Sequence, residues 1–471
     1  YPLRRQRQMC IRDSTQTLVI SGSNFQTGAT VTIDGTAPST VTRNSSTQIT
    51  ITGMPAKTAG TYGDGLKITN PTGLSATINV DYSALPAWTT ASGNVGSFFV
   101  TGSAITEIDL VATGEAPITY AITTGALPTG LTIGSTDGDI NGTMSGTAAT
   151  YNFTVNATDA EAQSSPRLFN IINRGALPTG GIISSPTGYK VHVFKVGMSE
   201  SFDFVIGCST AIDWLVVGGG GCGAGQMGAG GGGGGFRTGT NYTLAAGTYT
   251  ISVGVGGTAG PSPNESGAGD GGPSSIAALI VSNGGGGGGG YGDTSEECTG
   301  HDGGSGGGGA SGQGAGFAGG SALVLSPGQV TGEVTTVQGF DGGNGLDTGS
   351  NQYNGGGGGG ASAVGETPSS GDERGGDGGP GENNVMGMND ADSDAFLTAL
   401  SVGHDSGGTR YFGGGGGGAS YPISNGYGAG GVGGGGSDSV GIAHTGGGGS
   451  GKQGDVGYAG GSGIVIIRYE V

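Results

Sequence analysis

The stretch IDWLVVGGGGCGAGQMGAGGGGGG, residues 212–235, joins a hydrophobic run to two glycine tracts and decides the fold of the C-terminal part of the chain. Of the 116 glycines in this chain of 471 residues, 96 follow residue 180. Glycine is therefore about a third of that region, against ~7% in an average protein, which predicts a domain boundary near Gly180. Tracts of four or more glycines occupy residues 218–221, 230–235, 284–290, 306–309, 355–360, 413–418, 433–436 and 446–449.

Nucleotide binding is the first function to consider for glycines that follow a hydrophobic strand. Gly218, Gly220 and Gly223 satisfy the spacing G-x-G-x-x-G. That motif must open a helix, and each glycine in the sequence that follows would cost such a helix about 1 kcal/mol. A phosphate-binding loop of the Walker A type also fails, because Gly451-Lys452 is followed by Gln453 instead of Ser or Thr.

Three structures compete for the glycine tracts. A flexible linker would expose the apolar runs that alternate with the tracts, such as residues 276–281. Collagen needs glycine at every third position together with proline, which these uninterrupted runs lack. The remaining structure is a stack of extended helices with three residues per turn, the polyglycine II form, in which neighbouring backbones approach closely and hydrogen-bond to each other.

At this point the sequence resembles the glycine-rich domain of phage tail-fibre adhesins, over residues 188–471. The resemblance rests on the runs 189–194, 212–221 and 242–257 and on the ending at 460–469. It implies a rigid core of polyglycine II helices on a base of β-strands, with receptor recognition in the loops between the helices. A related domain occurs outside some animal receptor kinases, so the fold alone does not prove a phage origin.

The loops that interrupt the tracts are the candidate recognition surface, and the longest covers residues 365–412. Aromatic side chains on rigid loops supply contact area at a small cost in entropy. Phe340 and Phe412 have an equally good interpretation as caps on the ends of the lattice. The candidate receptor-binding residues are Tyr291, Phe340, Tyr353, Phe396, Tyr411, Phe412, Tyr421 and Tyr427.

The first 174 residues carry short β-branched segments separated by turn residues, which predicts two small β-sandwiches. Residues 15–82 resemble the IPT/TIG immunoglobulin-like family through Gly22-Ser-Asn-Phe25, Val31-Thr-Ile-Asp-Gly35 and Asn70-Pro-Thr-Gly-Leu-Ser75. Residues 83–174 resemble the immunoglobulin (Ig) or cadherin-like repeats of bacterial surface proteins and phage tail fibres. We expect residues 175–187 to be a linker and residues 1–14 to be a non-native, adaptor-derived segment. The predicted class is all-β.

Composition opposes several classes of partner. With 16 Lys+Arg against 35 Asp+Glu the net charge is −19, which disfavours nucleic acid and anionic lipid. No apolar run reaches the ~18 residues of a membrane span, so no membrane insertion is expected.

Chemistry-bearing residues are few and scattered. The four cysteines have neither a zinc-site nor a disulfide spacing. Residues 137–142 match the start of a calcium loop, but Ala148 stands at the position of the required Glu, so a hairpin turn is preferred. Asp390, Asp392 and Asp394 fit an acid-capped helix better than a cation site. The four histidines are isolated, so we expect no metal, no cofactor and no catalysis.

These observations together predict a virion protein, a phage tail-fibre adhesin. Its expected partners are a bacterial outer-membrane protein or surface glycan, and other tail proteins through the N-terminal side. The alternative is a bacterial secreted or cell-surface adhesin, which adjacent genes would distinguish from the first.

Overall fold

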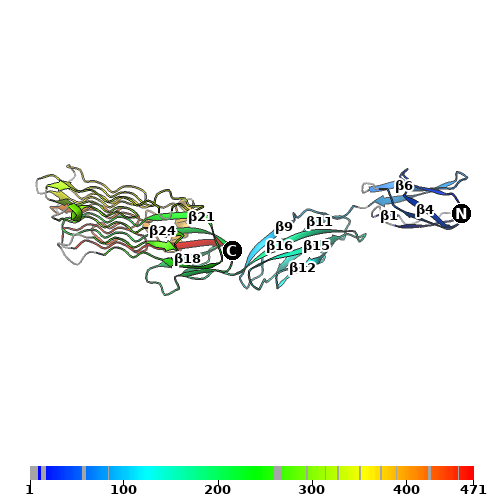
Figure 1. Ribbon diagram of the computed structural model, residues 1–471, viewed down its shortest axis with the longest axis horizontal. Coiled ribbons are helices and arrows are strands. Elements are labelled where there is room, and N and C mark those ends of the chain that lie inside the picture. Colours follow the sequence, from blue (N-terminus) through cyan, green and yellow to red (C-terminus); the bar gives the residue numbers. More distant parts are fainter. Residues whose placement is uncertain are drawn as a thin grey trace. The chain divides into compact units, whose positions relative to one another are not determined.

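The structure, a computed structural model, describes residues 9–11, 17–55, 60–82, 84–258, 268–292, 295–312, 314–325, 328–349, 352–371, 374–388, 390–422, 426–454 and 456–471. The chain divides into two compact units, Tyr1–Ala176 and Leu177–Val471 (Figure 1). Almost all regular elements are strands, so the all-β prediction is confirmed. The helices in the described part are α1 (Ser295–Cys298) and α2 (Asp390–Ala399).

Residues 17–82 form a sandwich of two small sheets. Alternation decides which side chains are inside: in β5, Ile49 and Ile51 are completely buried, while the other three residues of the strand are partly exposed. One sheet has the order β2-β5-β4 and the other β1-β7-β6-β3. The strands are β1 (Met9–Ile11), β2 (Leu18–Ser21), β3 (Thr30–Ile33), β4 (Thr40–Ser45), β5 (Gln48–Thr52), β6 (Gly60–Thr69) and β7 (Ser75–Tyr82).

The segment expected to be adaptor-derived is described only in part, since residues 1–8 and 12–14 lie outside the described residues. Met9–Ile11 form β1, which pairs in parallel with the end of β7. Backbone pairing of this kind needs only an open sheet edge and little from the side chains.

Residues 84–176 form the second sandwich. Phe153, Val155 and Phe169 fill its core, and the Trp88 ring meets the Phe169 ring edge-on at 5.2 Å. The turn predicted at residues 137–142 lies earlier in the structure: residues 134–138 connect β13 to β14, and residues 139–142 form β14 itself. Its sheets have the orders β12-β15-β16-β9, β10-β14-β13 and β11-β8. The strands are β8 (Ala87–Trp88), β9 (Gly93–Val100), β10 (Ile108–Asp109), β11 (Ala112–Thr113), β12 (Thr119–Gly125), β13 (Leu131–Ile133), β14 (Asp139–Gly142), β15 (Ala149–Thr158) and β16 (Ser164–Ala176).

The second unit begins with a base of two sheets. The five-stranded sheet has the order β17-β18-β32-β20-β21, and the four-stranded sheet the order β19-β22-β23-β24. Val216 and Val217, on opposite faces of β20, are both completely buried, which explains the continuous hydrophobic run at residues 214–217. The strands are β17 (Ile182–Ser184), β18 (Tyr189–Lys195), β19 (Asp203–Ile206), β20 (Thr210–Val217), β21 (Phe236–Leu244), β22 (Gly247–Ser252), β23 (Ser274–Ile276), β24 (Ile280–Ser282) and β32 (Ile464–Glu470).

The glycine tracts leave this base as extended helices whose hydrogen bonds repeat every third residue. Each backbone N–H of residues 218–224 donates to a neighbouring segment, and the third residue along returns to the same neighbour. A helix with three residues per turn has this property, because residues i and i+3 lie on one side of it. Gly218, Gly221 and Ala224 donate to Gly235, Gly232 and Ala229; Gly219 and Cys222 to Gly272 and Gly269; Gly220 and Gly223 to Gly461 and Tyr458. The predicted polyglycine II lattice is confirmed.

Residues 229–235 lie inside the lattice, surrounded by six other segments. Their N–H groups donate to three of them over 2.7–3.1 Å, and their carbonyls accept from three others. A Cβ on Gly232 would lie closer than 3.0 Å to the carbonyl oxygen of Ser305, so this approach requires glycine. The N–H groups of residues 229–235 donate to the segments 283–289, 356–359 and 446–449. The carbonyls of residues 229–235 accept from the segments 218–224, 305–308 and 413–419.

Candidate functional site

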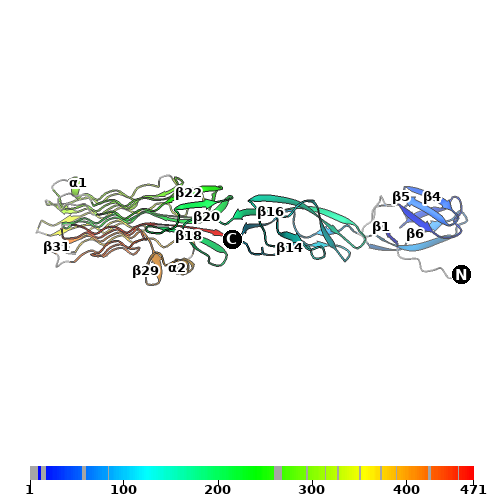
Figure 2. The same ribbon diagram turned by 90° about the horizontal axis from the view of Figure 1, so that it is seen from below.

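The lattice has one end at the base sheets and one free end. The helix of residues 218–224 leaves β20 and runs antiparallel to residues 229–235, which enter β21, so the turn between them lies at the free end. Figure 2 shows α1 and β31 (Ser420–Tyr421) at this end, away from β32. We call it the distal end, made of the described residues 225–228, 291–292, 346–349, 352–354, 420–422 and 452–454.

Three of the predicted recognition residues meet at the distal end. Tyr353 in β28 (Tyr353–Asn354) pairs with Tyr421 in β31, so their side chains lie on neighbouring strands. The ring centroids of Tyr353 and Tyr421 are 6.1 Å apart, and those of Tyr291 and Tyr353 are also 6.1 Å apart. We call Tyr291, Tyr353 and Tyr421 the tyrosine row. Residues more than a hundred positions apart in sequence thus form one aromatic surface.

An open hollow of about 530 Å³ lies beside the tyrosine row. Its lining carries no formal charge. Gln226 and Met227 have positive φ angles of 52° and 65°, a conformation that side chains other than glycine rarely adopt. Backbone hydrogen bonds from Gln226 N to Gly454 O and from Met227 N to Lys452 O hold this turn in place. The lining residues are Gln226, Met227, Tyr291, Tyr421, Gln453 and Gly454.

Two further tyrosines lie close to the distal end. Tyr427, a predicted residue, has its pKa raised mainly by burial, and its hydroxyl bonds the backbone of Gln453. Tyr458 was not predicted; its hydroxyl donates to Asp438 over 3.1 Å, and the Lys452 ammonium lies 4.9 Å from the centre of its ring. Because Tyr458 lies within a glycine-rich helix and not in a loop, the sequence did not indicate that it is close to the distal end.

The other four predicted residues lie near the base sheets. Phe412 is completely buried, with its ring 6.5 Å from that of Phe236, so it belongs to the core and is removed from the candidate surface. Phe396 in α2 packs against the same core, and the Arg468 guanidinium lies 5.6 Å from its ring centre. Tyr411 pairs with His404 in a hairpin, and Phe340 lines a separate cavity of about 250 Å³. The structure therefore separates the eight candidates into two groups of four.

The segment 365–412 is accordingly not one recognition loop. Its second half covers the face of the five-stranded sheet that the four-stranded sheet leaves open, with Val385 and Leu397 packed among Leu215 and Ile466. The expected helix is present as α2 but begins at Asp390, so Asp394 lies inside it and does not cap it; Asp394 instead accepts a hydrogen bond from the backbone N–H of Arg410 over 2.7 Å. The side chain of Asp390 lies outside the described residues. The remaining strands are β25 (Ser311–Gly312), β26 (Ala315–Gly316), β27 (Leu346–Asp347), β29 (His404–Ser406) and β30 (Thr409–Tyr411).

Comparison with known families matches this architecture. Residues 198–470, more than half of the chain, match the family described as Glycine-rich domain. The chain belongs to the glycine-rich domain family. Residues 84–174 match the family described as "Putative Ig domain". A glycine-rich domain behind an Ig-like domain is the composition of an adhesin-like or structural extracellular protein. Among the described residues, no helix is long and apolar enough to cross a membrane.

The solved structures that are similar to the chain contain small β domains, and both their sequence identities and their TM-scores are low. Sidekick-1 immunoglobulin domains 1–4 are 13% identical with a TM-score of 0.18, covering 45% of this chain and 60% of that one. Human CDH23 EC21–23 is 11% identical with a TM-score of 0.22, covering 45% and 81%. The CbhA fibronectin(III)-like modules of Clostridium thermocellum are 15% identical with a TM-score of 0.19, covering 37% and 93%. No curated protein sequence matches the chain.

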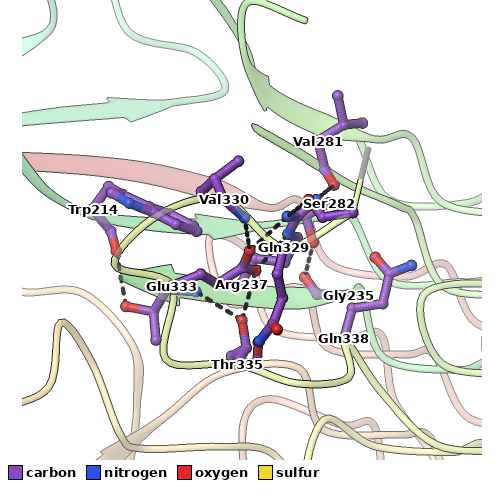
Figure 3. Close-up of polar contacts among 12 residues, drawn as sticks. Trp214, Gly235, Arg237, Val281, Ser282, Gln329, Val330, Glu333, Thr335 and Gln338 are labelled. Carbon is purple, nitrogen blue, oxygen red and sulfur yellow. Dashed lines mark hydrogen bonds and ion pairs between the residues drawn. The ribbon is translucent and has the colours of Figure 1, made fainter. Parts of the chain in front are cut away.

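The most deeply buried charges of the glycine-rich domain are structural. Arg237 and Glu333 are completely buried and form a double hydrogen bond, with Nε–Oε1 and Nη2–Oε2 both 2.8 Å apart (Figure 3). Arg237 also donates to the carbonyl of Val281, while Glu333 accepts from Val330 N and the Thr335 hydroxyl. The pair ties a loop of the base to β21 and β24. Sequence could not reveal it, because the partners stand 96 positions apart.

The histidines are held by structural contacts. Burial lowers the pKa of His192, whose Nδ1 lies 2.6 Å from the carbonyl oxygen of Gly180 and whose Nε2 lies 3.2 Å from the Tyr469 hydroxyl. The hydrogen bond that His301 Nδ1 donates to Asp270 raises the pKa of His301. His444 has Ser462 Oγ 3.1 Å from its Nδ1, but no ion pair in the described part of the chain joins His444 to a carboxylate.

No disulfide joins the described cysteine side chains. They are Cys208, Cys222 and Cys298; the side chain of Cys10 lies outside the described residues. Burial inside the lattice raises the pKa of Cys222 to about 12. A thiol with that pKa stays protonated at neutral pH and is a poor nucleophile.

Proposed function

We propose that this protein is a phage tail-fibre adhesin without catalytic activity, which attaches to a bacterial surface through the distal end of its glycine-rich domain. The observation that carries the proposal is the tyrosine row beside an uncharged hollow, at the free end of a packed lattice. The N-terminal side, with its Ig-like sandwich, then faces the other tail proteins.

A packed lattice suits this role because it fixes its turns before a receptor arrives. The turn at Gln226 and Met227 is held by backbone hydrogen bonds to the turn at Lys452 and Gly454. Tyr353 and Tyr421 of the tyrosine row are held by strand pairing between β28 and β31. Binding to a preorganised surface loses less side-chain and loop entropy than binding that must order a loop.

The lining of the hollow favours an uncharged receptor surface. Tyr421 is 41% exposed and offers both a ring face and a hydroxyl. The amides of Gln226 and Gln453 can each donate and accept hydrogen bonds. Such a surface fits an extracellular loop of an outer-membrane protein or a neutral surface glycan, while the net charge of −19 opposes anionic polymers.

The test measures binding of the purified full chain to a panel of Gram-negative strains by flow cytometry. Tyr291→Ala and Tyr421→Ala should each reduce binding to the recognised strains at least tenfold. Tyr411→Ala, an aromatic change near the base, should leave binding unchanged. Wild-type binding by both distal variants, or no binding of the native chain to any strain, would refute the role of the distal end. Antibody labelling at the tips of purified virions would support the phage assignment.

A further inference from the structure

The cavity of about 250 Å³ that Phe340 lines shares no residue with the distal hollow. Four short segments of the glycine-rich domain enclose it: residues 236–238 at the start of β21, 334–340, 361–362 and 382–384. Pockets for drug-sized ligands measure about 300–1,000 Å³. A smaller space such as this one suits a single side chain or a ligand of a few atoms.

Much of the cavity lining is apolar. Phe236, Phe340 and Ala361 contribute carbon surface. Val334 and Val337 also line the cavity and are 40% and 50% exposed, so the apolar surface continues to the outside of the molecule. We call Phe340, Val334 and Val337 the apolar wall. Because covering such a surface removes it from water, the wall favours a ligand with an aliphatic part.

The Glu382 carboxylate carries the only formal charge in the lining. The backbone of Glu382 is fixed by two hydrogen bonds with the backbone of Phe412, of 2.9 and 3.0 Å. Its Oε1 accepts the N–H groups of Asn383 and Asn384, both over 2.9 Å. No ion pair in the described part of the chain involves Glu382. The carboxylate is therefore held in one place without a cationic partner, and these bonds leave Oε2 to a ligand or to water.

We propose that this cavity binds a primary alkylammonium group, with the alkyl chain against the apolar wall and the ammonium against Glu382. An ammonium is a compact positive charge with three N–H donors. Ser362 supplies a second acceptor beside Glu382: its hydroxyl donates to the carbonyl of Gly381 over 3.0 Å, which leaves the lone pairs of its oxygen available.

Other charged ligands fit the same residues less well. A guanidinium binds best to both oxygens of a carboxylate at once, but Oε1 of Glu382 already accepts two N–H groups. Calcium takes six to eight oxygen ligands, and the lining offers a single carboxylate. An anion would be repelled. The lysine side chain of another protein and a free alkylamine share the chemistry that remains.

Ligand-observed NMR titrations of the full chain with n-pentylammonium chloride and with 1-pentanol test the proposal, since the two ligands differ only in the head group. The native chain should bind pentylammonium at least tenfold more tightly, because a hydrogen bond to a charged group is roughly twice as strong as a neutral one. Glu382→Gln keeps the shape of the side chain and its Oε1 acceptor, so it should bind the two ligands equally. Its binding of pentanol should match that of the native chain, which shows that the cavity is intact.

Glu470→Gln is the matched control, because it removes the same charge from an exposed residue outside the cavity. This control should keep the native preference for pentylammonium. Val337→Ser removes part of the apolar wall and should weaken the binding of both ligands. A titration with N-acetyl-lysine N-methylamide separates the sources: affinity equal to that of pentylammonium assigns a lysine of a partner protein, and weaker affinity assigns a free alkylamine.

Four results would each overturn the proposal: no binding of pentylammonium by the native chain, equal binding of pentylammonium and pentanol by the native chain, a retained preference in Glu382→Gln, or native binding of both ligands by Val337→Ser. Loss of the preference in Glu470→Gln would also overturn it, since net charge and not Glu382 would then attract the amine. None of these measurements depends on receptor binding at the distal end.

Discussion

Single glycines in the lattice are required mainly because neighbouring backbone atoms leave no room for a side chain. The conformational freedom of glycine matters less. The hydrogen bonds of Gly230, Gly231 and Gly232 lead to three different segments, so no side of the helix is left open for a side chain. Backbone carbonyls stand where a Cβ would be, and they cannot move without breaking other hydrogen bonds of the lattice. Glycine here is a packing residue.

Gly232→Ala should therefore be strongly destabilising. Overpacking a rigid core typically costs about 1–3 kcal/mol, and the fixed backbone around Gly232 places this variant at the upper end or beyond. Gly207→Ala is the matched control, because a Cβ there would meet nothing within 4 Å. Differential scanning calorimetry of the full chain should show a lower transition temperature for the first variant alone. Equal transitions for both would contradict the packing argument.

The pKa values of His192 and His301 should be shifted in opposite directions from the usual histidine pKa of about 6.5. Burial lowers the pKa of His192, so its contribution to stability is complete above about pH 6.5 and is lost as the pH falls toward the folded pKa. The hydrogen bond that His301 donates to Asp270 raises the pKa of His301, whose contribution is complete below about pH 6.5 and lost as the pH rises through the folded pKa.

The ring resonances of these histidines, followed by NMR across the pH range, check both directions. The chain has only four histidines, so single substitutions can assign them. His192→Gln should remove a resonance that titrates below pH 6.5, and His301→Gln one that titrates above it. The reverse order would show that burial does not set the pKa of His192 and that Asp270 does not set the pKa of His301.

At the scale of elements, α2 has a structural task that its sequence did not reveal. It covers the open face of the five-stranded sheet, and Leu397 is completely buried against that sheet. The segment was expected to be a recognition loop because it is the longest interruption between glycine tracts. Length alone cannot tell a loop that binds a partner from one that covers a core.

Leu397→Ala should destabilise the base by about 2–5 kcal/mol, the usual cost of removing a buried leucine side chain. Thr398→Ala, one residue along on the exposed side of α2, should change stability by less than about 0.5 kcal/mol. Denaturant unfolding followed by circular dichroism compares the two variants. Equal stabilities would mean that α2 does not hold the base together.

Much of the fold followed from the sequence because its patterns are local. Alternation predicted strands such as β5, and uninterrupted glycine predicted the lattice. The site was less predictable, since the tyrosine row joins residues from three separate segments of the chain, and aromatic residues in loops serve binding and packing alike. The same limit hid the Arg237–Glu333 pair, whose meeting depends on the complete topology.

At the scale of the whole molecule, the glycine-rich domain is held together in two different ways. Its base is held by apolar side chains such as Trp214 and Phe236, but its lattice is held by main-chain hydrogen bonds between helices. Side chains appear where the helices end, which leaves the distal end free to vary without altering the lattice.

Hydrogen exchange of the backbone amides tests this account most directly. In the full chain at neutral pH, peptides that cover residues 229–235 should stay protected for hours, since each of these amides donates to a neighbouring segment. Peptides from the exposed turn at Gly407 and Gly408 provide the fast-exchanging reference. Exchange of residues 229–235 as fast as this turn would show that the glycine tracts are flexible linkers, and would contradict the lattice on which the proposed function rests.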